Sequence, residues 1–138
     1  MTAVRRMQVL EQQAGKLLVK LGYEPVIVSS FVRSCRYIAF HLTARKKLAD
    51  GTVDSVMVKL KISLHPIESL AEAAAFCRDE IVSVKKFFAQ IPPDEKRTRF
   101  EVWVSIPLSG FQQFEITREG IREIRSPGDR LSCVRGGP

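Results

Sequence analysis

The chain has 138 residues, of which 45% are apolar and 27% are charged, and its formal net charge is +7. That length and apolar content predict a single domain with one core and argue against a disordered or low-complexity chain. No apolar run approaches the ~18 residues of a membrane span, so we expect a cytoplasmic protein without membrane association. Cys35, Cys77 and Cys133 have no paired spacing, which argues against a disulfide framework or a structural zinc site.

The first expected element is an amphipathic helix. From Ala3 to Leu21 apolar residues recur every three or four positions, which places them on one side of a helix. Gly22 follows the last of them, and glycine readily adopts the left-handed conformation that closes a helix. We therefore expect a helix that ends at Gly22.

Three stretches rich in β-branched and aromatic residues follow this helix. They predict strands at 26–28, 37–42 and 56–62. The sequence Ala-Asp-Gly-Thr at 49–52 predicts a turn. The second and third strands should therefore form an antiparallel hairpin.

The second half of the chain begins with another long helical pattern. It predicts a helix over about 66–90, and alternating apolar residues then predict strands at 100–106 and 111–117. The expected fold class is α/β (α+β), with elements in the order α-β-β-β-α-β-β. We expect one domain over 1–125 and a flexible C-terminal tail over 126–138, where apolar residues are few.

Basic residues gather in the middle of the chain. Between positions 33 and 61 the acids are Asp50 and Asp54, against the basic residues Arg33, Arg36, Arg45, Lys46, Lys47, Lys59 and Lys61. Clustered basic side chains release counterions from phosphates, so we expect DNA binding through Arg33, Arg45, Lys46 and Lys47. The alternative for Arg45-Lys46-Lys47 is a solvated hairpin tip.

Two short segments resemble a known family. Arg36-Tyr37-Ile38-Ala39-Phe40 resembles the Asp-hydrophobic-hydrophobic-Ala segment of the PD-(D/E)xK nuclease superfamily, which includes archaeal Holliday junction resolvases and restriction endonucleases. Val58-Lys59-Leu60-Lys61-Ile62-Ser63 resembles its hydrophobic-Glu-x-Lys-x-Ser segment. The resemblance spans about residues 7–106 and implies a restriction-endonuclease-like fold, with a mixed central sheet flanked by helices.

The same resemblance implies that the acidic metal ligands have been replaced. In the family an Asp and a Glu hold the divalent ion that activates water, and a Lys assists. Here Arg36 stands at the Asp position and Lys59 at the Glu position, whereas Lys61 matches. Because cations at both ligand positions would repel Mg²⁺, we expect an inactive domain with no bound metal and no cofactor.

Glu11 is the acid that could remain from the family's site. The family often places a helix Glu beside its metal, and Glu11 falls within the apolar arc of the first helix. The alternative is that Glu11 lies at the edge of that arc and its carboxylate reaches solvent. Lys59 and Lys61 alternate along one strand, so they should share a face, with Arg36 on the neighbouring strand. We expect Glu11 to pair with Lys59 or Lys61, or a phosphate-like anion to balance the cations.

Other residues with functional chemistry have structural interpretations. His41 and His65 have no second ligand at metal-binding spacing, so both are predicted to be structural. Trp103, Phe111 and Phe114 could stack on single-stranded bases, but aromatic residues on adjacent strands more often pack in a core or a dimer contact. Trp103 occupies the polar register of its strand, which a helix covering the second face of the sheet would explain.

Three functions are compatible with these features. The leading one is a catalytically inactive nuclease-like domain that binds DNA through its phosphate backbone. The alternative is a scaffold or protein-interaction domain that forms a homodimer and has no nucleic-acid role. The third is a metal-dependent nuclease that recruits acids from elsewhere, such as Glu11, Asp50 or Asp54.

Overall fold

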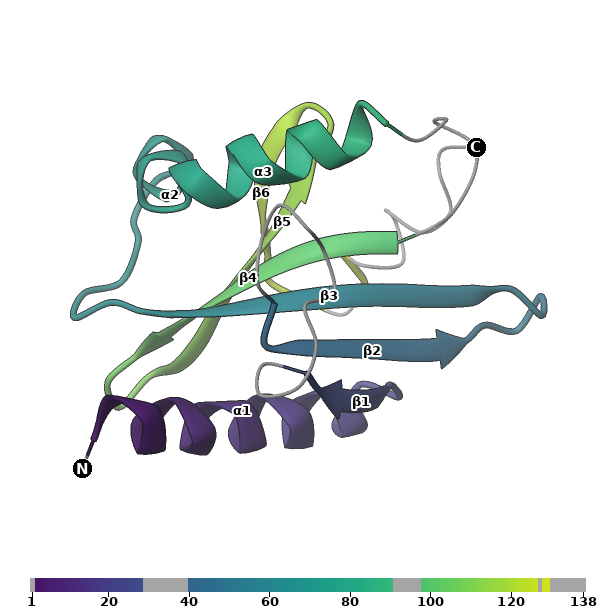
Figure 1. Cartoon of the computed structure of the whole chain (residues 1–138), viewed down its shortest axis with the longest axis horizontal. Helices are drawn as coiled ribbons and strands as arrows, with labels where there is room; N and C mark the ends of the chain where they lie inside the picture. The colour runs from purple at the N-terminus through teal and green to yellow at the C-terminus, as the bar shows by residue number, and fades with distance from the viewer. Residues whose placement is uncertain (1, 29–39, 91–97, 127, 130–138) are drawn as a thin grey trace.

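The computed structural model describes residues 2–28, 40–90, 98–126 and 128–129. Within them the chain forms three helices and one six-stranded sheet (Figure 1). The elements are α1 (Ala3–Lys20), β1 (Glu24–Ile27), β2 (Leu42–Lys47), β3 (Val53–Ile62), α2 (Leu70–Phe76), α3 (Arg78–Phe88), β4 (Thr98–Ile106), β5 (Gly110–Thr117) and β6 (Gly120–Ile124).

The six strands lie in the sheet in the order in which they occur in the chain. β3 and β4 pair in parallel, and every other neighbouring pair is antiparallel. A parallel pair needs a crossover connection, and α2 and α3 supply it between β3 and β4. The expected mixed sheet flanked by helices is therefore confirmed.

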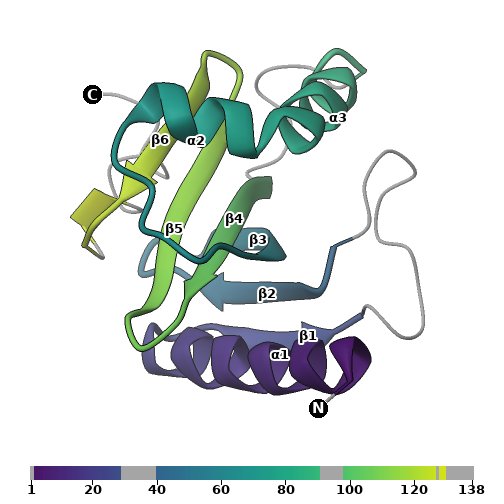
Figure 2. The same ribbon diagram turned by 90° about the vertical axis from the view of Figure 1, so that its left-hand side faces the viewer.

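α1 covers one face of the sheet (Figure 2). Its apolar side packs Leu10, Ala14 and Leu18 against inward-facing residues of β2 and β3. Trp103 on β4 belongs to the same cluster and is fully buried. The helix that covers the second face thus explains why Trp103 occupies the polar register of its strand.

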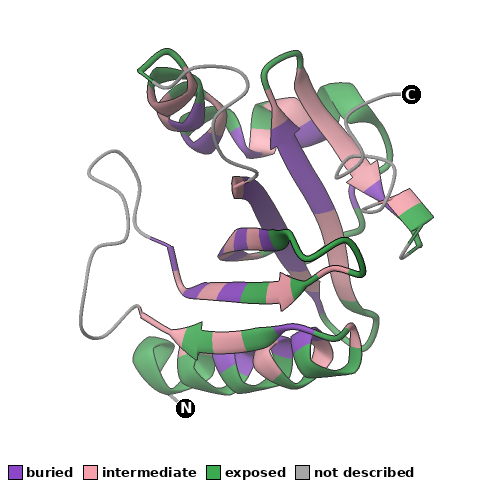
Figure 3. Cartoon of the chain, turned by 90° about the vertical axis from the view of Figure 1, so that its right-hand side faces the viewer, coloured by how far each residue is buried: buried purple, intermediate pink, exposed green. Residues whose placement is uncertain are grey.

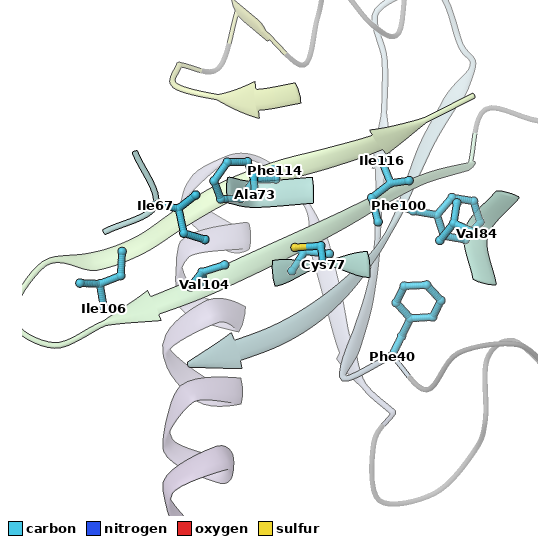
Figure 4. Close-up of a cluster of buried hydrophobic side chains, with 11 residues drawn as sticks. Phe40, Ile67, Ala73, Cys77, Val84, Phe100, Val104, Ile106, Phe114 and Ile116 are labelled. Carbon is cyan, nitrogen blue, oxygen red and sulfur yellow. The ribbon is translucent and has the colours of Figure 1, made fainter. Parts of the chain in front are cut away.

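α2 and α3 cover the opposite face (Figure 4). Alternate residues of β4, among them Phe100 and Val104, pack there against Val84 of α3 and against Cys77, which joins α2 to α3. Phe114 on β5 joins this cluster, whereas Phe111 packs with Trp103 on the α1 side. These aromatic side chains are therefore core contacts and do not form one stacking surface.

Local interactions set the ends of α1. The hydroxyl of Thr2 accepts a hydrogen bond from the backbone N–H of Arg5 at 3.1 Å, which caps the N-terminus. Gly22 has a φ of 95°, which favours glycine, so the helix ends where the sequence predicted.

None of the helices within the described residues is long and apolar enough to cross a membrane.

The strands differ from the prediction at three places. β2 begins at Leu42, so the strand expected over 37–42 was placed too early, although 37–39 lie outside the described residues. β2 continues through Lys47, so 45–47 are paired strand residues that lead into the turn, with Arg45 and Lys47 exposed as a solvated hairpin end would have them. β6 was not predicted, because its five residues include the charged pair Arg122 and Glu123.

The long helix expected over 66–90 is two helices. α2 starts after Ser69, whose hydroxyl accepts a hydrogen bond from Glu72 N–H, and not at Pro66. The two helices are separated at Cys77, whose φ of −104° and ψ of 23° lie outside the helical range. The tail expected over 126–138 lies outside the described residues except for 126, 128 and 129, so its flexibility stays a prediction.

Candidate functional site

Lys59 and Lys61 point to the same face of β3, as their alternation predicted. Val56, Val58 and Leu60 pack towards α1, so the two lysines face the side covered by α2 and α3. Arg36, the third residue of the predicted site, lies outside the described residues. The described part of the site is therefore built on β3 and on what packs above it.

Lys61 is bound to the junction between α2 and α3. Its ammonium donates to the backbone carbonyl of Phe76 at 2.7 Å and to Glu80 Oε1 at 3.0 Å. It also lies 4.6 Å from the centre of the Phe76 ring. Phe76 is the last residue of α2 and Glu80 lies in the first turn of α3, so Lys61 ties both helices to the sheet.

Glu80, and not Glu11, is the carboxylate that pairs with Lys61. The predicted pairing with Glu11 is wrong because Glu11 lies on α1, which covers the opposite face of the sheet. The interpretation of Glu11 as a solvent-exposed acid is also wrong, since only 4% of it is accessible. Glu80 occupies a position within the helical stripe between Cys77 and Val84, which is the sequence signal that could have identified it.

Lys59 is a half-buried cation with a different environment. Within residues 2–28, 40–90, 98–126 and 128–129 its ammonium makes no hydrogen bond and no ion pair. Burial lowers the pKa of Lys59, the nearby charge of Glu80 raises it, and Lys61 lowers it further. Among the described residues, no carboxylate therefore contacts the ammonium of Lys59 directly.

His41 stands beside Lys59 at the start of β2. Its Nδ1 accepts a hydrogen bond from the backbone N–H of Leu60 at 2.9 Å. Burial, together with the charge of Lys59, lowers the pKa of His41 to about 4, so the ring is neutral at pH 7. A neutral imidazole that accepts at Nδ1 carries its proton on Nε2, which makes that atom a hydrogen-bond donor.

The basic residues of β2 point to both faces of the sheet. Arg45 and Lys47 are exposed and share the face of Lys59, because they pair in register with Ser55 and Val53. Lys46 points the other way: its ammonium donates to the Leu21 carbonyl at 3.1 Å and lies 5.5 Å from the Tyr23 ring centre. Lys46 thus binds the C-terminal end of α1. Arg33 lies outside the described residues.

A buried polar network lies on the α1 side of the sheet. Arg99 donates to Asp54 Oδ1 at 2.9 Å and to Oδ2 at 2.8 Å, and it also donates to Glu101. The Tyr23 hydroxyl donates to Asp54 and accepts from Arg99 at 2.7 Å, and Trp103 Nε1 donates to Glu101 at 2.8 Å. Burial raises the pKa of Tyr23, so its hydroxyl stays protonated.

Arg99 keeps its charge inside this network. Burial lowers the pKa of Arg99, but hydrogen bonding to Asp54 and the charges of Glu101 and Asp54 outweigh burial and raise it above its usual value. Both carboxylate oxygens of Asp54 are therefore engaged by a permanent cation. This engagement argues against Asp54 as a recruited metal ligand.

The remaining candidate metal ligands are dispersed. Asp50 accepts hydrogen bonds from the backbone and the hydroxyl of Thr52, at 3.0 and 2.6 Å, which closes the β2–β3 turn. In the part of the chain that the structure describes, no three His, Cys, Asp or Glu side chains are grouped so that they could hold a metal ion. His65 is exposed, and its backbone bonds to the Ser63 side chain.

A scan of the sequence against protein-family models finds no match, and a search of curated proteins finds none either. Among solved structures, the chain is similar to that of Hjc, a Holliday junction resolvase from the archaeal hyperthermophile Archaeoglobus fulgidus. The two share 13% identity over 90% of this chain and 92% of that chain, with a TM-score of 0.43. At this identity the likeness concerns the path of the chain, and the chemistry is that of the residues described above.

Proposed function

We propose that this chain is a nuclease-like domain that binds nucleic acid through the phosphate backbone and does not cleave it. The two segments that resemble PD-(D/E)xK nucleases have a cation at each position where the family has a metal-binding acid. An ammonium group offers only hydrogen-bond donors, whereas Mg²⁺ takes oxygen ligands. Lys59 therefore suits an anion and not a metal ion.

The observation that carries the proposal is the state of Lys59. Partly buried cations are usually paired, yet within the described residues Lys59 has neither a hydrogen bond nor an ion pair. The neutral ring of His41, on which the charge of Lys59 acts, carries a further hydrogen-bond donor, Nε2–H. An ammonium group and an imidazole N–H are both donors to phosphate oxygens.

The surroundings of Lys59 extend this site into a surface. Arg45 and Lys47 are exposed on the same face of the sheet. Among strands β1 to β3, the one carboxylate on that face is Glu24, which lies opposite Arg45. A face on which cations outnumber acids attracts the backbone of a polyanion without reading its bases.

We expect the purified protein to bind duplex and branched DNA at low salt and to leave both uncut in Mg²⁺ or Mn²⁺. The double variant Arg45→Gln/Lys47→Gln should reduce the slope of log affinity against log salt by up to about 2, since each lost phosphate contact removes about 0.9. Fluorescence anisotropy over a salt series, run beside a gel assay for cleavage, measures both quantities.

The matched control is Lys85→Gln/Lys86→Gln, which removes the same charge from exposed positions of α3. An equal decrease in slope for this control would show that net charge and not the Lys59 face drives binding. Cleavage that disappears in Glu11→Gln would contradict the inactive assignment and support the recruited-acid nuclease. Undetectable binding at low salt, with a dimer mass by light scattering, would support the scaffold alternative.

A further inference from the structure

The outward side of α1 is a second cationic surface. The charged side chains exposed along this helix are all basic: Arg5, Arg6, Lys16 and Lys20. The acid of the helix, Glu11, is turned towards the sheet and buried. Figure 3 shows exposed residues on the side of α1 that faces away from the sheet.

The spacing of these residues gathers them on one strip. At 100° per residue, Arg5, Lys16 and Lys20 fall within about 60° of one another around the helix axis. At 1.5 Å per residue the strip from Arg5 to Lys20 is about 22 Å long, a length over which duplex DNA carries about 13 phosphates. α3 differs, because Asp79 is exposed there beside Arg78.

The first turn of α1 shows that helix stability does not explain this pattern. The positive end of a helix favours acidic residues, but the first turn of α1 has none and instead contains Arg5 and Arg6. Like charges at this end cost a few tenths of a kcal/mol each. Unfavourable local choices of this kind are expected where a surface has a binding role.

The chemistry of the strip favours duplex nucleic acid over other polyanionic surfaces. An amphipathic helix enters a membrane with its apolar side, but in α1 that side, with Leu10, Ala14 and Leu18, is buried in the core. Single strands are held by stacking on exposed aromatic side chains, and α1 contains no aromatic residue. The strip therefore fits the regularly spaced phosphates of a duplex.

The α1 strip and the Lys59 face point in opposite directions, since α1 covers the face of the sheet opposite to Lys59 (Figure 2). Resting on the proposed phosphate-binding function, we infer that the outward face of α1 binds a second duplex segment, so that one molecule bridges two duplexes. One duplex cannot lie along both surfaces, because the sheet and the helix separate them.

The test is a capture experiment with the full chain. An immobilised duplex is loaded with protein and then offered a second, labelled duplex at low salt. The native protein should capture the labelled duplex, whereas Arg5→Gln/Lys16→Gln/Lys20→Gln should lose most of this capture while it still binds one duplex, with a salt slope lower by up to about 3. The matched control is Arg78→Gln/Lys85→Gln/Lys86→Gln on α3, which should retain capture.

Capture of the labelled duplex that persists in the α1 variant, whether through one molecule or through a dimer of the protein, would overturn the inference. An unchanged salt slope in that variant would also overturn it, while normal binding of the first duplex would leave the phosphate-binding function standing. If neither the native protein nor any variant binds a duplex, both the phosphate-binding function and the inference for α1 are contradicted. Binding of the native protein to anionic phosphatidylserine vesicles, with none to duplex, would assign the α1 strip to a membrane surface instead.

Discussion

His41 shows how one side chain can connect the sheet to the anion site. Its Nδ1 accepts the backbone N–H of Leu60, a group that a strand would otherwise pair with a carbonyl. Protonation of the ring would remove this acceptor and place a second cation beside Lys59. The neutral state of His41 is therefore part of the folded structure.

We predict that the stability of the protein falls between pH 6.5 and pH 4 partly because of His41. Its pKa is depressed from 6.5 to about 4 in the folded state, so the unfolded state binds the proton first and stability decreases as the pH falls through this window. The contribution lost by pH 5 should be about 1–2 kcal/mol. Urea unfolding at pH 7 and pH 5 measures it.

His41→Gln is the informative variant, because the glutamine side-chain oxygen can accept the Leu60 N–H and does not titrate in this range. It should lose less stability than the native protein between pH 7 and pH 5. An identical loss in both proteins would show that His41 does not carry the effect. A similar change at exposed His65 serves as the control.

At the scale of elements, the α2–α3 junction depends on Lys61. The apolar stripe from Leu70 to Phe88 runs through Cys77 without interruption, so the sequence pattern predicted one helix. In the structure the ammonium of Lys61 donates hydrogen bonds to the carbonyl of Phe76 and to the carboxylate of Glu80, where α2 meets α3. This tertiary contact depends on which face of β3 meets the helices, and local spacing does not contain that information.

Lys61→Met should destabilise the protein by about 2–3 kcal/mol, because it leaves the buried Glu80 carboxylate without its cation and the Phe76 carbonyl without a donor. The double variant Lys61→Met/Glu80→Leu should recover most of that loss, since an apolar pair can replace a buried ion pair. Chemical denaturation measures both. The salt slope for DNA should be unchanged in the double variant, because Lys61 is already neutralised; a lower slope would instead make Lys61 a phosphate contact.

The whole molecule shows which parts of a fold follow from local pattern. Most of the element order and the common face of Lys59 and Lys61 could be predicted, because hydrophobic periodicity determines them. β2 was placed too early because Arg45, Lys46 and Lys47 are uncommon strand residues, yet pairing with both β1 and β3 holds them in the sheet.

Which side chains contact one another at the site was harder to predict from the sequence than where the site lies in the fold. Glu80 reaches Lys61 from a segment 19 residues later, and Lys46 donates to the Leu21 carbonyl on the other face of the sheet. The basic strip of α1 was not predicted, although its spacing is readable, because the net excess of charge in the sequence lies at 33–61. Burial of Glu11, which leaves that strip without an acid, requires the structure.

The Arg99 network has a consequence for the order in which the protein folds. Arg99 bonds to Asp54, 45 residues earlier, and to Tyr23, 76 residues earlier, so its bonds close only after three distant segments have met. Because closing loops of this length costs conformational entropy, we expect these contacts to form after the rate-limiting barrier. Arg99→Met leaves two buried carboxylates without their cation, at a cost of about 3–5 kcal/mol in the free energy of unfolding. The variant should therefore unfold about a hundredfold faster or more, while its folding rate should fall little. Stopped-flow kinetics across a urea series would reveal this, with exposed Arg125→Met as the control; a folding limb slowed by the same factor would instead make this network the nucleus from which the chain folds.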